Sequence, residues 1–155
     1  LQGELVLPSS KVKHALIRIS YPFGNKFSTK DFANKVVEYI KSDLPLFSDQ
    51  EFTPTYLPDL ARVILHIASN KITGRFHVAT HPITTPYQFA TQLAENLSFV
   101  NKVKGCPIEK YLKTSNSVPR LIHGGLLTDK TEAKLAIRFH SWKEAIDQFT
   151  KEARF

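Results

Sequence analysis

The sequence predicts an α/β fold with parallel strands. Short apolar segments alternate with amphipathic segments of about 10 to 15 residues, which is the pattern of βαβ units. The first apolar segment, residues 14–20, is apolar almost throughout, as expected for a strand that is covered on both faces. Two capping boxes, at Thr85 and Ser141, mark helix starts within the same pattern. The 155 residues suffice for one domain.

The predicted elements follow in order from the first strand. A turn at residues 21–25 leads to a helix that is expected to begin near Ser28, with Asp31 in its first turn to complement the positive helix end. A weak strand at residues 46–47 and a connection through Pro54 come next. The remaining elements are a helix from about Pro58, a strand at residues 75–79, a helix capped by Thr85, a short strand within residues 104–113, a loop at residues 114–125, a short helix at about residues 129–136 and a last helix capped by Ser141.

Composition narrows the class of protein. With 42% hydrophobic and 23% charged residues, the chain has the composition of a globular protein. No apolar run approaches the ~18 residues that span a bilayer, so no membrane partner is expected and the cytoplasm is the predicted compartment. The net charge of +7 favours anionic ligands. Lys and Arg are scattered, however, and form no dense helix face, so nucleic acid is not an expected partner.

The residues alone show no complete active site. The six histidines do not cluster with carboxylates at metal-ligand spacing, so no metal is expected. The single Cys106 excludes an internal disulfide and a multi-thiolate site. No Gly-rich phosphate loop follows a strand, and no Ser-centred nucleophile elbow is present. These observations describe a basic α/β chain that cannot catalyse a reaction by itself.

Three segments, taken together, resemble a known superfamily. They are Arg-Ile-Ser-Tyr-Pro-Phe-Gly-Asn-Lys-Phe at residues 18–27, Asp-Gln-Glu-Phe-Thr-Pro-Thr-Tyr-Leu-Pro-Asp-Leu-Ala at residues 49–61 with Gly-Arg-Phe-His at residues 74–77, and Pro-Arg at residues 119–120 with Leu-Leu-Thr-Asp-Lys at residues 126–130. In this order they resemble the extended short-chain dehydrogenase/reductases, and most closely the dTDP-4-dehydrorhamnose reductase branch. The resemblance covers essentially the whole chain.

The resemblance implies the C-terminal part of a Rossmann-type NAD(P)-binding fold plus the small substrate-binding subdomain. Residues 1–24 would be the tail of the Rossmann-like domain, and residues 25–155 mainly the substrate-binding subdomain with interleaved Rossmann elements. Gly3 and Glu4 match a pair that follows the catalytic Lys in this branch. The Tyr-x-x-x-Lys pair and the dinucleotide-binding Gly motif are therefore expected in a missing N-terminal half. No residue of this chain is assigned as catalytic, and the chain is expected to be inactive alone.

The resemblance also implies ligands and the residues that contact them. The parent protein would use NAD(P)H to reduce a keto group on a nucleotide-diphosphate sugar. Ser20, Tyr21 and Pro22 are the candidate cofactor contacts, because ligands of open α/β sheets gather at the carboxyl ends of strands. The candidate substrate contacts are Tyr21, Asn25, Phe27 and Arg120. A turn role for Asn25 and a surface ion pair for Arg120 are the alternatives.

Several residues depart from the family pattern. Tyr21 stands where the family has Trp, Leu121 where it has Pro and Leu127 where it has Asp. Phe52 replaces a Gly, which would reshape the local turn or narrow the pocket, and Asp59 is interpreted as a helix-dipole and capping group. A nucleotide-sugar epimerase or dehydratase, and a regulatory subunit resembling the methionine adenosyltransferase β-subunit, remain alternatives. A homodimer is also compatible with the resemblance.

Overall fold

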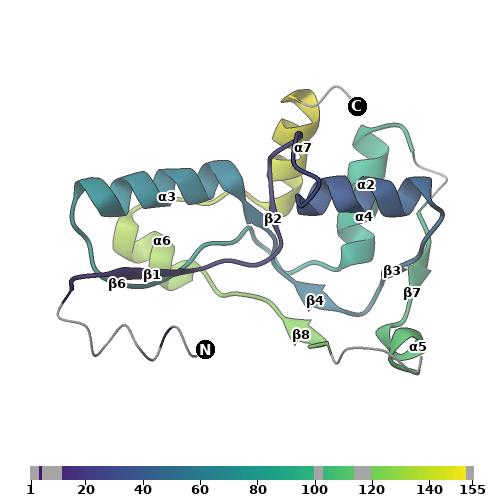
Figure 1. The fold of residues 1–155 in the computed structure, drawn as a ribbon, viewed down its shortest axis with the longest axis horizontal. Coiled ribbons are helices and arrows are strands. Elements are labelled where there is room, and N and C mark those ends of the chain that lie inside the picture. The colour runs from purple at the N-terminus through teal and green to yellow at the C-terminus, as the bar shows by residue number, and fades with distance from the viewer. Residues whose placement is uncertain (1–3, 5–11, 100–102, 114–119, 153–155) are drawn as a thin grey trace.

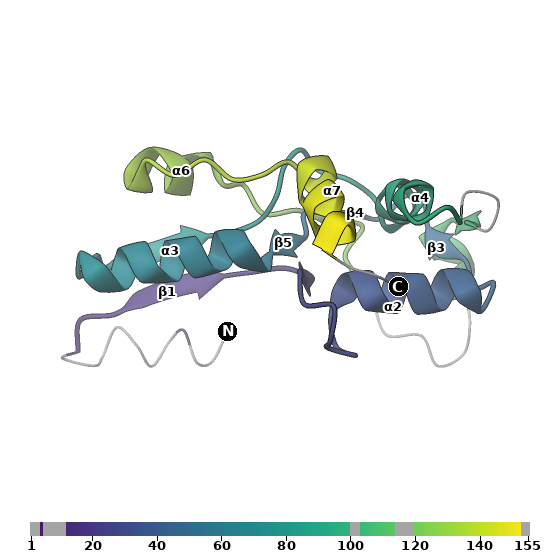
Figure 2. The ribbon, with the colours of Figure 1, turned by 90° about the horizontal axis from the view of Figure 1, so that it is seen from above.

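The computed structural model describes residue 4 and residues 12–99, 103–113 and 120–152. Gly3 and Pro119, which contributed to the resemblance, lie outside the described residues. The described chain forms two lobes side by side (Figures 1 and 2). All four strand pairs are parallel, which confirms the predicted α/β class with parallel strands. No helix of the described part is long and apolar enough to cross a membrane.

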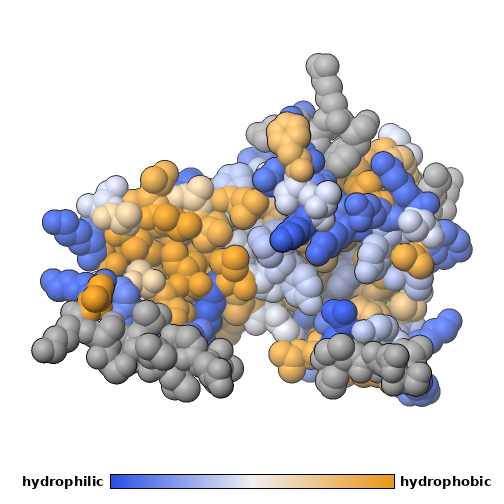
Figure 3. Space-filling view, in the orientation of Figure 1, coloured by the Kyte–Doolittle hydropathy of each residue, from blue (hydrophilic) through white to orange (hydrophobic). Residues whose placement is uncertain are grey.

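The first lobe is a two-stranded ribbon with two helices. Strand β1 (Ala15–Arg18) pairs with β6 (Gly74–His77), and α3 (Leu57–Ser69) and α6 (Asp129–Leu135) pack with them (Figure 1). The core of this lobe consists of Val63, Ile67, Phe76, Val78, Leu135 and Phe139. All four residues of β1 remain half-buried. A hydrophobic area is left exposed on this lobe (Figure 3).

The second lobe is a helical cluster with a short strand pair. Its elements are α2 (Phe32–Lys41), α4 (Pro86–Asn96), α7 (Trp142–Glu152), β3 (Leu46–Phe47), β7 (Gly105–Cys106) and α5 (Ile108–Leu112). Phe89, Ala90 and Leu93 of α4 are fully buried because α2 and α7 both pack on this helix. Both predicted capping boxes are confirmed: Thr85 caps α4 together with Gln88, and Ser141 exchanges hydrogen bonds with Glu144 at the start of α7.

Two further strand pairs lie between the lobes and position the candidate site. Strand β2 (Pro22–Phe23) pairs with β5 (Thr55–Tyr56), and β4 (Glu51–Phe52) pairs with β8 (His123–Gly124). Each of these strands has two residues and exists only through a partner far away in the sequence. For that reason the predicted turn at residues 21–25 and the predicted loop at residues 114–125 each turn out to contain part of a strand pair.

One predicted helix start was wrong, and one further helix was not predicted. Helix α2 begins at Phe32 instead of near Ser28, because Asp31 is its N-cap and accepts hydrogen bonds from the backbone N–H groups of the first turn. Residues 104–113 hold the predicted strand and also α5. The N–H of Ile108 donates to Asp49 Oδ1 at 2.8 Å, so α5 is capped by a residue that no local pattern could reveal.

Candidate functional site

Tyr21 forms an aromatic wall just beyond the end of β1. Its backbone has φ 44°, in the left-handed region that bulky residues rarely adopt. Two rings meet it edge-on: Phe32 at 5.1 Å and Phe52 at 5.0 Å between ring centroids. Tyr21 nevertheless remains 38% exposed. Strained backbone clusters at functional sites, and a ring already held on two sides loses little freedom when a ligand stacks on it.

Phe52 lies beneath this wall instead of lining a pocket. It is 1% exposed and belongs to the core of the second lobe, where its ring lies 5.3 Å from that of Phe32. The interpretation that Phe52 narrows the pocket was therefore wrong, because its side chain points into the core. Its contact with Tyr21 instead fixes the position of the exposed ring.

Ser20 and Pro22, on either side of Tyr21, offer few polar groups. Ser20 N donates to Thr55 Oγ1 at 3.0 Å, and Thr55 N donates to Ser20 O at 2.7 Å. Pro22 has no N–H and is exposed at the start of β2. The Ser20 hydroxyl and the Pro22 ring therefore remain candidate contacts beside Tyr21.

Asn25 and Phe27 lie in the loop that precedes α2. Asn25 Oδ1 accepts from Phe27 N at 3.0 Å, and Asn25 N donates to Asp31 Oδ2 at 2.8 Å, so Asn25 organises this turn. Its Nδ2 and the second lone pair of Oδ1 are the side-chain groups left for a ligand contact. Phe27 is 87% exposed, with the ammonium of Lys26 5.2 Å from its ring centroid. The structure therefore places Phe27 on the surface and not in a formed pocket.

Arg120 lies against two aromatic rings. Its Cζ is 5.3 Å from the ring centroid of Tyr111 and 5.9 Å from that of Phe47, and these rings pack edge-on at 5.4 Å. Arg120 itself is exposed. A guanidinium that lies near aromatic rings gains cation–π attraction, and its fork of N–H donors suits paired bonds to phosphate oxygens. Phe47 and Tyr111 are supporting residues that the sequence analysis missed, because no local pattern brings them together.

One segment, residues 47–52, joins the two candidate contacts. Phe47 supports Arg120 at one end of the segment, and Phe52 supports Tyr21 at the other. The Cα atoms of these two Phe residues are at most about 18 Å apart, since five extended residues span no more than that. The pairing of β4 with β8 holds the segment in place. The same short segment therefore supports both candidate contacts.

A polar network lies at the carboxyl ends of β1 and β6. Arg18 forms two bonds to the Glu4 carboxylate, from Nε at 3.0 Å and from Nη2 at 2.6 Å. The hydrogen bond from Arg18 lowers the pKa of Glu4. Arg18 Nη1 also lies 3.4 Å from His77 Nε2, and His77 Nδ1 lies 3.0 Å from Leu127 O. This network anchors Glu4, which the sequence indicated only through its register, to the carboxyl end of β1.

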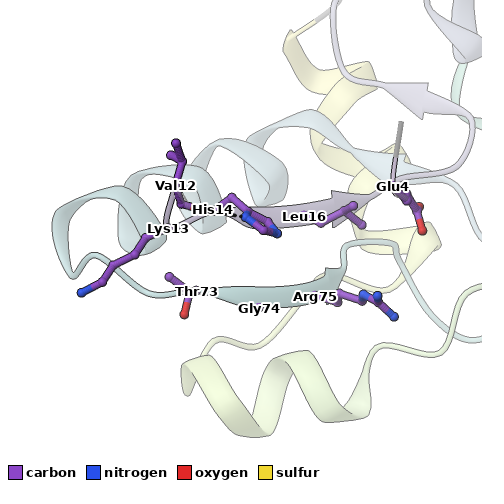
Figure 4. A pocket seen from close by; sticks show the side chains of 8 residues that line it. All are labelled: Glu4, Val12, Lys13, His14, Leu16, Thr73, Gly74 and Arg75. Atoms are coloured by element: carbon purple, nitrogen blue, oxygen red, sulfur yellow. Dashed lines mark hydrogen bonds between the residues drawn. The ribbon is translucent and has the colours of Figure 1, made fainter. Parts of the chain in front are cut away.

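A cavity of about 320 Å³ lies mainly at the opposite edge of the ribbon and extends along it to Glu4 (Figure 4). Its lining residues are Glu4, Val12, Lys13, His14, Leu16, Thr73, Gly74 and Arg75. Most of them belong to the amino-terminal ends of β1 and β6, whereas ligands of open α/β sheets bind at the carboxyl ends. We therefore assign the candidate site to the surroundings of Tyr21 and Arg120 and not to this cavity.

The groups present here could hold only part of a dinucleotide. The six glycines of the sequence form no Gly-x-Gly-x-x-Gly motif, and no Tyr is followed four residues later by Lys. The sequence thus contains no phosphate loop of this type. Among the described residues, no three His, Cys, Asp or Glu side chains gather as a metal site requires.

Comparison with known proteins shows the family of this chain. A family model, the RmlD substrate binding domain, matches residues 1–155. The spore coat polysaccharide biosynthesis protein SpsK of Bacillus subtilis is 27% identical over 150 residues, which are 97% of this chain and 51% of SpsK. The dTDP-4-dehydrorhamnose reductase of Bacillus anthracis, solved in complex with NADP, superposes with a TM-score of 0.83 at 19% identity, over 98% of this chain and 52% of the reductase. A dTDP-4-dehydrorhamnose reductase of Clostridium acetobutylicum gives a TM-score of 0.82 at 25% identity, over 97% of this chain and 52% of its own. The chain thus spans about half the length of these relatives.

Proposed function

The chain belongs to the RmlD substrate binding domain family, and we propose that it is the substrate-binding half of an NAD(P)-dependent nucleotide-sugar reductase. The observation that carries the proposal is the aromatic support of both candidate contacts by one segment, with Phe52 against Tyr21 and Phe47 against Arg120. A nucleoside-diphosphate sugar carries both the rings and the diphosphate that such groups bind. The net charge of +7 also attracts an anionic ligand.

In this proposal each candidate residue has a role. Arg120 pairs with the diphosphate, and Tyr21 forms a wall shared by the sugar and the cofactor. The other candidates flank these ligands: Asn25 and Phe27 on the sugar side, and Ser20 and Pro22 on the nicotinamide side. NAD(P)H, bound to the complete protein, would supply the hydride that reduces a keto group. This chain would contribute binding and orientation, and it would be inactive without a dinucleotide-binding half.

Calorimetric titration with dTDP tests this proposal. We expect Arg120→Ala to weaken dTDP binding about ten- to a hundredfold, because paired charge-assisted hydrogen bonds to the diphosphate are lost. Arg75→Ala is the matched control. It removes the same charge from the cavity at the opposite edge, and we expect it to leave the affinity unchanged.

Other outcomes of the titration would contradict the proposal. Weakening by Arg75→Ala instead of Arg120→Ala would move the anion site to the cavity. A chain that binds neither dTDP nor UDP would count against any nucleotide-sugar enzyme and would favour a regulatory subunit. A clear preference for UDP over dTDP would favour the epimerase alternative.

A further inference from the structure

One side chain in the first turn of α2 holds the loop of residues 25–28. This loop lies between β2 and α2 (Figure 1). Asn34 Nδ2 faces three carbonyl oxygens of the loop. They belong to Asn25 at 3.1 Å, Lys26 at 3.2 Å and Ser28 at 2.9 Å. A side-chain amide has two N–H donors, so the three carbonyls share them, and the backbone on both sides of Phe27 is tied to the helix.

Asn34 stands at a helix position whose side chain usually serves the helix itself. It is the third residue after the N-cap Asp31, where the side-chain oxygen of a capping box accepts from the N–H of the N-cap residue. Here Asp31 N donates to Ser28 O at 3.1 Å instead. The side-chain oxygen of Asn34 is buried and has no hydrogen-bond partner among the described residues. A buried carbonyl without a donor lowers stability, so this side chain is not arranged for the most stable helix cap.

The loop that Asn34 holds carries an exposed aromatic ring. Phe27 is 87% exposed, so its ring adds little to the core. The first turn of α2 also contains Phe32, whose ring lies 5.1 Å from that of Tyr21. One helical turn therefore supports two candidate substrate contacts, Tyr21 through a ring contact and Phe27 through the loop backbone.

We propose that Asn34 is a positioning residue, which holds the loop of residues 25–28 so that Phe27 meets the sugar of a nucleoside-diphosphate sugar. The inference rests on the proposed function, in which Phe27 lies on the sugar side. An aromatic face offers apolar contact area to the C–H groups of a sugar ring. A loop that is ordered before binding loses less conformational freedom when the ligand arrives, so a fixed Phe27 contributes more affinity than a mobile one.

Amide hydrogen exchange measures the state of the loop directly. Phe27 N donates to Asn25 Oδ1 at 3.0 Å, and Ser28 N donates to Asn25 O at 3.1 Å. We expect both amides to exchange about tenfold or more faster in Asn34→Ala, because the loop opens locally. The urea midpoint of this variant should stay close to that of the wild type, because the substitution removes the unpaired oxygen together with the donor.

Calorimetric titrations with dTDP and with dTDP-glucose measure the sugar contact. We expect the glucose to raise the affinity of the wild-type chain about three- to tenfold, and Asn34→Ala to reduce this gain to less than about twofold. Phe27→Ala should reduce the gain equally, and the double variant should show no further loss, because Asn34 acts through Phe27. The matched control is Asn96→Ala, which removes an Asn of the same lobe that donates to Asp147 and Thr150. It should keep both the gain and the exchange rates.

Each other outcome overturns the inference. Unchanged exchange in Asn34→Ala would mean that the loop is held without this side chain. A gain that survives Asn34→Ala or Phe27→Ala would place the sugar elsewhere, and an equal loss in Asn96→Ala would assign the effect to general destabilisation.

The same titrations separate this inference from the proposed function. Binding of dTDP that depends on Arg120, without any gain from the glucose, rejects the positioning role of Asn34 and keeps the function. A chain that binds neither ligand rejects the function, and the inference falls with it.

Discussion

The two lobes differ in how completely they bury their apolar side chains. In the second lobe Phe89, Leu93 and Ile146 are fully buried among three helices. In the first lobe every residue of β1 is only half-buried, and Leu65 of α3 is 67% exposed. A cluster of helices can bury its apolar side chains by itself, whereas a parallel strand pair needs further strands and helices to cover its apolar side chains.

The largest expected effect comes from creating a cavity in the buried core of the second lobe. Phe89 is 0% exposed and its ring packs on those of Phe23, Phe32 and Phe52. We expect Phe89→Ala to lower the free energy of unfolding by about 3–5 kcal/mol, because the cavity cannot refill. Leu65→Ala in the first lobe should change it by no more than about 0.5 kcal/mol. Urea denaturation of both variants measures the two changes. Equal losses of unfolding free energy would contradict the difference in burial between the lobes.

The contact between the lobes at Asp59 is expected to give the next largest effect on stability. Asp59 of α3 is 2% exposed, and its Oδ2 accepts from the backbone N–H of His140, just ahead of α7, at 2.9 Å. Its Oδ1 lies 2.8 Å from His140 Nδ1 and accepts from Arg62. The carboxylate thus ties α3 to the segment that leads into α7, whereas the sequence suggested a helix-dipole and capping group. We expect Asp59→Ala to cost about 2–3 kcal/mol of unfolding free energy, because hydrogen bonds to a buried charge are lost.

Two spectroscopic probes test whether the contact of Asp59 with His140 couples the unfolding of the two lobes. Trp142 fluorescence reports on the second lobe, and far-ultraviolet circular dichroism reports on both. We expect coincident unfolding transitions in the wild-type chain and separate ones in Asp59→Ala. Asp129→Ala, at an exposed acid in the first turn of α6, is the control and should keep the transitions together. Coincident transitions in Asp59→Ala would show that other contacts couple the lobes.

The smallest effect is a pH dependence within the closed lobe. Burial raises the pKa of Asp31, the N-cap of α2, and outweighs the hydrogen bonds from the backbone of Asn25, Asn34 and Ala33. The folded state therefore holds this proton more tightly than the unfolded chain, whose Asp pKa is about 3.9. The stabilising contribution is full below that pH and is lost as pH rises through the folded pKa.

Replacing this carboxyl removes the dependence. We expect the free energy of unfolding of Asp31→Asn, relative to that of the wild type, to increase as pH rises from about 4 to 7. Thermal unfolding of the two proteins across this range measures the difference. A constant difference would show that Asp31 titrates alike in the folded and unfolded states.

Local signals in the sequence account for much of the second lobe. The capping boxes at Thr85 and Ser141 were predictable because each joins residues three positions apart. The helix start at Ser28 failed for a related reason, since two polar residues competed for the cap and Asp31 accepts the bonds of the first turn. The two-residue strands could not be predicted, because each depends on a remote partner.

The candidate site was less predictable than the fold. Tyr21 and Arg120 were singled out through resemblance, and their ligand roles remain predictions. What holds them in place came from the structure: Phe52 beneath one, Phe47 and Tyr111 beneath the other. Each of these supports comes from a segment that is remote in sequence from the residue it holds.

The sequence by itself determined the parallel α/β class, the capped helix starts and the lack of a dinucleotide motif, because these depend on composition and on neighbours within a few residues. Only the tertiary structure decided which groups meet. Asp59 and His140 are 81 positions apart, and nothing local predicts their contact. The exposure of Ile64 and Leu65 on α3, at 47% and 67%, is likewise a result of packing, since it depends on which segments of the described chain cover the helix.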